Sequence, residues 1–183
     1  MAESFTNVST RKIGVTTSVN TATVGAAGFA ITNCSTFNVS PGMLVDHANF
    51  VKGTRVTVIN TASNFGTSGE ITVDTVSTNT ETLENATIGF HTVSSVYTAA
   101  EKTILVGGTL ANNTNSQIEA TVMLNQSGND NINIIASAPI PAGSSLVISD
   151  AGKLVVGIGS TISVSTNSDN AVDSSFSFLK GVS

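Results

Sequence analysis

Residues 137–166 read SAPIPAGSSLVISDAGKLVVGIGSTISVST, and this stretch holds two of the chain's three prolines and four of its 16 glycines. Between the turn-forming residues lie three short runs made mostly of Val, Ile, Leu and Ser, at residues 144–148, 153–156 and 161–166. Such runs, bounded by Gly, Pro and Asp, are typical of β-strands joined by tight turns. Pro139 and Pro141 are predicted to end the preceding strand and to stiffen a corner, where their missing N–H groups are harmless. The stretch therefore predicts an antiparallel β fold.

The same pattern continues on both sides of this stretch. Eight strands are predicted, at residues 93–98, 103–111, 116–124, 131–138, 144–148, 153–156, 161–166 and 174–179. Eight short strands in roughly 90 residues are typical of an antiparallel sandwich or a jelly roll. In IEATVML, residues 118–124, apolar side chains alternate with polar ones, which marks a strand with one buried face. We predict a β-sandwich or jelly-roll-like domain over residues 93–183.

Residues 19–92 repeat the pattern in a looser form. Strands are predicted at residues 22–24, 29–31, 54–59, 70–76 and 87–90, and Ser40-Pro41-Gly42 is a turn signal. Strands that recur about every ten residues, with turn chemistry between them, favour a small all-β domain. Residues 1–18 are predicted to be an N-terminal arm or short strand. The predicted fold class is therefore all-β, with two small antiparallel β domains.

The composition excludes several classes of function. Charged residues make up only 10% of the chain, against roughly 25% in an average soluble protein. The net charge is −5, and Arg11-Lys12 is the only adjacent pair among seven basic residues. Nucleic-acid binding normally leaves a basic footprint, so we expect no nucleic-acid partner. No apolar run is long enough to span a membrane and the N-terminus lacks an apolar signal segment, so we expect neither a membrane partner nor export.

The residues that most often carry chemistry are few. Cys34 is the only cysteine, and we interpret it as a small buried hydrophobe rather than a reactive thiol. His47 and His91 are the only histidines, and Asp46-His47 is the one acidic–histidine neighbour pair. Because a catalytic histidine also needs an oriented nucleophile, we expect structural or exposed roles for both. The sequence predicts no catalytic residue and no enzyme activity.

Two Asp/Asn clusters offer oxygen ligands for a calcium ion. They are Asn129-Asp130-Asn131, and Asp169-Asn170 with Asp173. Each supplies only one or two carboxylates, whereas calcium takes six to eight oxygens, and Asn and Asp in loops are commonly there for turn geometry. The Gly-x-Gly at residues 157–159 lacks the third glycine and the following helix of a dinucleotide site. We predict no metal-binding residue, no cofactor-binding residue and no cofactor.

The second predicted domain resembles a β-sandwich domain common in virion proteins of marine tailed phages. The matching residues are Tyr97-Thr98, Leu110-Ala111-Asn112, 139–146, 152–155 and 171–179. Gly157-Ile158-Gly159 stands where that family usually has an acidic turn. The opening MAESFTNVST is similar to the start of small structural proteins of T4-like cyanophages. The first domain more loosely resembles units of phage tail and fibre proteins, at residues 37–45, 53–59 and 71–77.

This resemblance implies a non-enzymatic structural protein of a bacteriophage virion, either a head decoration or an accessory component of the neck or tail. It implies assembly in the host cytoplasm, with other virion proteins and with copies of the chain itself, as a trimer or ring. The alternative is a receptor-binding or glycan-binding fibre module of the virion, which Phe50 and Phe65 in predicted loops keep open. A small hydrolase is a third class, for which the sequence offers no active-site layout.

Overall fold

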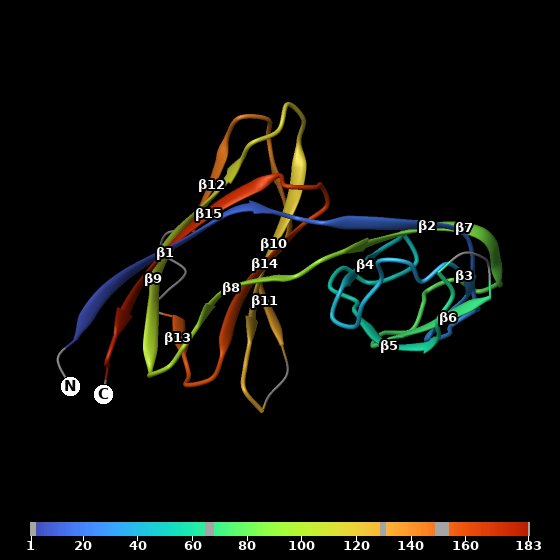
Figure 1. The fold of residues 1–183 in the computed structure, drawn as a ribbon, viewed down its shortest axis with the longest axis horizontal. Coiled ribbons are helices and arrows are strands. Elements are labelled where there is room, and N and C mark those ends of the chain that lie inside the picture. The colour runs from blue at the N-terminus through green and yellow to red at the C-terminus, as the bar shows by residue number, and fades with distance from the viewer. Residues whose placement is uncertain (1–2, 65–67, 129–130, 149–153, 183) are drawn as a thin grey trace. The chain divides into compact units, whose positions relative to one another are not determined.

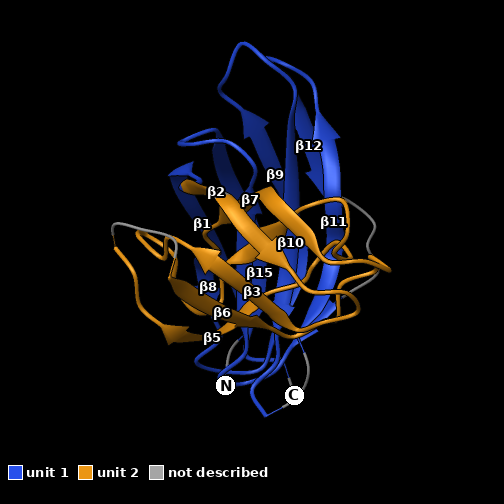
Figure 2. Ribbon diagram, turned by 90° about the vertical axis from the view of Figure 1, so that its right-hand side faces the viewer, with its two compact units in different colours: residues 1–15, 94–183 blue, residues 16–93 orange. Residues whose placement is uncertain are grey.

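The computed structural model describes residues 3–64, 68–128, 131–148 and 154–182. In these residues the chain forms fifteen strands and no helix, so the predicted all-β class is confirmed (Figure 1). The described part contains no helix that could cross a membrane. The chain divides into two compact units (Figure 2): unit 1 is Met1–Val15 with Ser94–Ser183, and unit 2 is Thr16–Val93.

Unit 1 contains two antiparallel sheets. The five-stranded sheet runs in the order β1 (Ser4–Ile13), β15 (Val172–Lys180), β9 (Thr103–Asn112) and β12 (Ser145–Ile148), with β13 (Leu154–Val156) also on β9. The four-stranded sheet runs in the order β11 (Ile132–Ile140), β10 (Ile118–Asn125), β14 (Thr161–Thr166) and β8 (Ser94–Thr98). The first and last strands of the chain therefore lie side by side (Figure 1). Residues 1–18 were predicted to be an arm or a short strand, and in the structure they contain the ten-residue strand β1.

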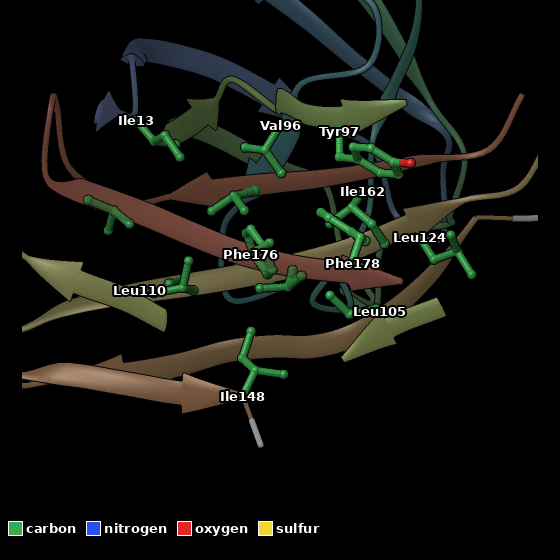
Figure 3. Packing of buried hydrophobic residues seen from close by; sticks show 14 of the residues in the cluster. Ile13, Val96, Tyr97, Leu105, Leu110, Leu124, Ile148, Ile162, Phe176 and Phe178 are labelled. Carbon is green, nitrogen blue, oxygen red and sulfur yellow. The ribbon is translucent and has the colours of Figure 1, made fainter. Parts of the chain in front are cut away.

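Side chains from both sheets meet in one apolar core, which makes unit 1 a β-sandwich, as predicted (Figure 3). Phe176 and Phe178 on β15 are fully buried, and the ring of Tyr97 on β8 stacks on Phe178 with a centroid distance of 3.9 Å. Gly108 on β9 leaves room for Phe176, because a Cβ at this glycine would lie 2.4 Å from the Cδ1 atom of that ring. A glycine in a central strand weakens the strand locally, and here it is required by close packing.

One prediction about the opening stretch was wrong. The strand before the proline corner does not end at residue 138, because β11 continues to Ile140 and pairs Pro139 with Glu119. Since β11 is the last strand of its sheet, half of its backbone groups have no ladder partner and a proline is tolerated there. The corner itself follows at Pro141, whose carbonyl accepts hydrogen bonds from both the backbone N–H and the hydroxyl of Ser144.

Unit 2 is a single six-stranded antiparallel sheet. Its order is β4 (Leu44–Asp46), β7 (Leu83–His91), β2 (Thr16–Val24), β3 (Ala30–Cys34), β6 (Gly69–Val73) and β5 (Val56–Thr61). The N–H of Val45 donates to the carbonyl of Thr54 at 2.8 Å, and the N–H of Val56 donates to the carbonyl of Met43 at 2.9 Å. These bonds join the first strand of the sheet to the start of the last, so the sheet curls into a barrel-like unit. Its apolar side chains, Cys34 and Phe90 among them, form a second core.

Candidate interaction surface

In the structure Asp46 contacts His91 and not His47, its neighbour in the sequence. Strands β4 and β7 place Leu44 opposite His91, and Oδ2 of Asp46 lies 3.4 Å from Nε2 of His91. The other carboxylate oxygen, Oδ1, accepts a 3.0 Å hydrogen bond from Nζ of Lys52. The imidazole of His47 contacts its own loop instead, where its Nδ1 accepts a hydrogen bond from the backbone N–H of Asn49 at 3.2 Å.

Asp46 forms an ion pair with Lys52 and contacts the imidazole of His91. Partial burial raises the pKa of the Asp46 carboxyl, but hydrogen bonds and charge from Lys52 and then His91 outweigh burial, so this pKa lies below its usual value. In a catalytic triad the nucleophile lies at the imidazole nitrogen opposite the carboxylate. Here that nitrogen is Nδ1 of His91, which is buried and has no hydrogen-bond partner among the residues that the structure describes. The geometry links Lys52, in the loop after β4, to Asp46 and links Asp46 to His91 of β7.

Of the predicted oxygen clusters, Asn129 and Asp130 lie outside the described residues, and Asn131 is exposed. In the second cluster Asp173 serves strand pairing: its Oδ1 accepts a 2.8 Å hydrogen bond from the backbone N–H of Lys12. That bond, together with Asn113 and Arg11, holds the pKa of the Asp173 carboxyl below its usual value. Across the described ranges, no group of three or more His, Cys, Asp and Glu side chains is arranged to hold a metal ion.

Asp169 and Asn170 lie in the loop between β14 and β15. Both are exposed, and Asn170 has a positive φ of 51°, a conformation that Asn tolerates in turns. The backbone N–H of Asn170 donates to the carbonyl of Gly14 at 2.9 Å. Cys34, by contrast, is fully buried in the barrel core, and burial raises the pKa of its thiol.

The outer face of the five-stranded sheet carries a row of apolar side chains. The register places Phe5 of β1 opposite Leu179 of β15, Leu179 opposite Ile104 of β9, and Ile104 opposite Val155 of β13. The neighbouring residues in each strand face the core, so these four side chains, which we call the outer row, point away from it. Phe5 is 75% exposed and Val155 is 48% exposed, whereas the two residues between them are half-buried. The outer row therefore crosses four adjacent strands.

The two rows of this outer face next to the outer row, near β1, are polar and uncharged, and charges appear only farther along β1, where Arg11 contacts Asp173. In the next row the hydroxyl of Ser177 donates to Oδ1 of Asn7 at 2.8 Å, and in the row beyond, the hydroxyl of Ser9 donates to that of Ser175 at 3.2 Å. Short neutral side chains lose little rotamer entropy on burial and cost less to desolvate than charges do. The outer row and its surroundings together form a surface that can be covered by another protein at low cost.

Strand β1 also ends the sheet and carries an open edge. Among the described strands it pairs only with β15, so half of its backbone N–H and C=O groups point away from the sheet. Proteins usually protect such edges with charges, prolines or bulges. Residues 4–10, SFTNVST, contain no charge and no proline, and the bulge lies beyond them, between Thr10 and Ile13. This edge is suited to pairing with another strand.

Two aromatic residues on which the fibre alternative depended do not support it. Phe50 lies in the loop between β4 and β5, as expected, but it is only 5% exposed and belongs to the barrel core. Phe65 lies outside the described residues. The exposed aromatic side chains of unit 2 are instead Phe29 and Phe37, at 52% and 51% exposure among the described residues. Sequence reasoning missed both because each lies in a short segment without clear alternation.

No family model, curated protein or solved structure matches the chain in the three comparisons with known proteins.

Proposed function

We propose that this chain is a non-enzymatic structural protein of a bacteriophage virion, acting as a head decoration or as an accessory component of the neck or tail. The observation that carries the assembly role is the outer row, an apolar band that crosses four strands of a sheet with an open edge and is exposed at both of its ends. Exposed apolar bands rimmed by polar residues mark protein–protein contacts. The virion setting is supported by the family-like segments of unit 1, above all residues 139–146.

The physical chemistry of the surface supports the same role. With only 10% charged residues, the chain has few charges to desolvate when its faces are covered by neighbours. Subunits of closed assemblies remove open sheet edges by pairing or covering them. We therefore propose copies of this chain and other virion proteins as its partners, and the virion, assembled in the host cytoplasm, as its location.

Mass spectrometry of purified phage particles tests the proposal. The chain is expected in many copies per particle, and its absence from intact particles would refute the structural role. A Phe5→Asp variant is expected to enter particles less efficiently, because it places a charge at the most exposed end of the outer row. A Phe29→Asp variant makes the same change at an exposed phenylalanine of unit 2 and is the matched control.

The alternative is a receptor-binding or glycan-binding fibre module, and exposed Phe29 and Phe37 favour it. Aromatic rings that stand in solvent are common contacts for ligands because they bury a large area at low entropic cost. A glycan array with the purified chain tests this function. Binding that disappears in Phe37→Ser and persists in Phe5→Ser would replace the structural role with the fibre role.

A further inference from the structure

We infer that two copies of this chain join through β1, antiparallel to each other about a two-fold axis at Asn7. The two five-stranded sheets then continue into one sheet. The inference rests on the proposed assembly role and names the surface that serves it. Its occupant is a second copy of the same strand rather than an unidentified partner.

The first argument is that the two copies of β1 suit each other in this register. With Asn7 opposite Asn7 of the second copy, Phe5 lies opposite Ser9, and Ser4 lies opposite Thr10. Every pair within residues 4–10 is uncharged, so no like charges face each other. Phe5, Asn7 and Ser9 all lie on the outer face, so the pairing keeps outward side chains beside outward ones.

The second argument is charge complementarity at both ends of the paired segment. The same register places Glu3 opposite Arg11 of the second copy, and by symmetry this ion pair occurs twice. Arg11 is 80% exposed and contacts Asp173 on the outer face at 3.5 Å, so its guanidinium would lie between two carboxylates. Phe5 is then the diagonal neighbour of Arg11 of the second copy, within the reach of a cation–π contact.

Other registers lose these contacts. A two-fold axis at Val8 places Glu3 opposite Ile13 and Phe5 opposite Arg11, and an axis at Thr6 places Glu3 opposite Ser9. An axis between two residues would set outward side chains against inward ones, since side chains alternate along a strand. With the axis at Asn7, by contrast, uncharged residues lie opposite uncharged ones, Glu3 lies opposite Arg11, and outward side chains lie beside outward ones.

Asn7→Asp tests the axis without disturbing the free chain. A carboxylate at this position still accepts the 2.8 Å hydrogen bond from the Ser177 hydroxyl, but it sets two negative charges against each other in the dimer. Ser145→Asp makes the same charge change at an exposed position of β12 and is the control. By sedimentation velocity at low salt, Asn7→Asp is expected to weaken the dimer about fivefold, while the control leaves it unchanged.

Asn7→Cys provides an independent test, because only a two-fold axis at this residue brings it close to its own copy. Directly opposite residues in antiparallel strands have Cα atoms about 4.5–5.5 Å apart, within the range of a disulfide. Mild oxidation is expected to link two Asn7→Cys chains covalently, whereas Ser145→Cys should stay unlinked. The native thiol, Cys34, is buried and does not compete.

The outcomes separate this inference from the proposed function. A chain that stays monomeric at every concentration, or a dimer that resists Asn7→Asp and does not cross-link through Asn7→Cys, would overturn the β1 contact. A dimer weakened by Ser145→Asp instead would indicate a head-to-tail contact and would also overturn it. In each case, many copies of the chain in purified particles would leave the structural role standing.

Discussion

Asn112 at the end of β9 is expected to be among the most important polar residues of the sandwich. Its side chain is buried, with only 3% of the residue exposed. The side-chain amide donates to the carbonyls of Ser116 at 2.8 Å, Ile140 at 2.9 Å and Pro141 at 3.0 Å. Oδ1 accepts from both the backbone N–H and the hydroxyl of Thr114, each at 2.8 Å. One side chain thus joins the turn after β9 to the proline corner after β11.

Asn112→Ala removes all of these bonds and adds nothing in their place. A typical hydrogen bond contributes about 1 kcal/mol net, and a buried polar group left without a partner costs about 1–3 kcal/mol. With the Ile140 carbonyl bond buried and the others partly buried, we expect the free energy of unfolding to fall by about 3–5 kcal/mol. Since domains are typically stable by about 5–15 kcal/mol, this is a large fraction of the total.

Urea unfolding followed by tyrosine fluorescence measures this loss. The chain has one tyrosine, Tyr97, and no tryptophan, and Tyr97 lies in the sandwich core, so the signal reports on unit 1. Asn115→Ala, at an exposed position in the same turn, is the control and is expected to change stability by less than about 0.5 kcal/mol. If Asn112→Ala cost no more than the control, the hydrogen-bond reasoning would be refuted.

Two further predictions concern packing and charge. Gly108→Ala is expected to lower the free energy of unfolding by about 1–3 kcal/mol, because the new Cβ would lie 2.4 Å from the Phe176 ring. Gly157→Ala, at an exposed position, is the control. Equal losses for the two variants in urea unfolding would contradict the packing argument. Asp46→Asn removes a carboxyl whose pKa is lowered in the folded chain. Such a carboxyl stabilises the fold at pH values above its unfolded-state pKa, and this stabilisation is lost as the pH falls through the folded-state pKa. The unfolding temperature, followed by circular dichroism, should therefore fall more in the wild type than in Asp46→Asn between about pH 6 and pH 3. Parallel curves would contradict the stabilising role of the contacts of Asp46 with Lys52 and His91.

The strands could be predicted from the sequence where local chemistry decides them. Runs such as IEATVML and TISVST carry apolar residues at every second position, and Gly, Pro and Asn separate the runs. The predicted strands at 116–124 and 161–166 therefore correspond to β10 and β14. The end of β11 was misjudged because the effect of a proline depends on whether its strand lies at a sheet edge. That position is a property of the whole sheet and not of the residues around Pro139.

The interaction surface could not be predicted because its residues are distant in the sequence. The hydroxyl of Ser177 and the amide oxygen of Asn7 are hydrogen-bonded although they are 170 residues apart. Likewise, Asp46 contacts His91, 45 residues away, rather than the adjacent His47. A strand's alternation shows that it has two faces, but only the pairing of strands tells which side chains form a row. Phe5 was therefore visible as an apolar residue in a polar segment, without its neighbours in the outer row.

The open edge and the outer row both depend on the pairing of β1 with β15. Phe5 can extend the outer row only while β1 remains paired with β15, and that pairing has to cross the bulge between Thr10 and Ile13. At the bulge Lys12 adopts a positive φ of 56°, and its N–H donates to the side-chain carboxylate of Asp173 on β15. Asp173 thus replaces a missing ladder bond and holds Arg11 on the outer face. Removing this carboxylate should loosen the edge strand and displace Phe5 together, so the edge and the apolar row act as one surface.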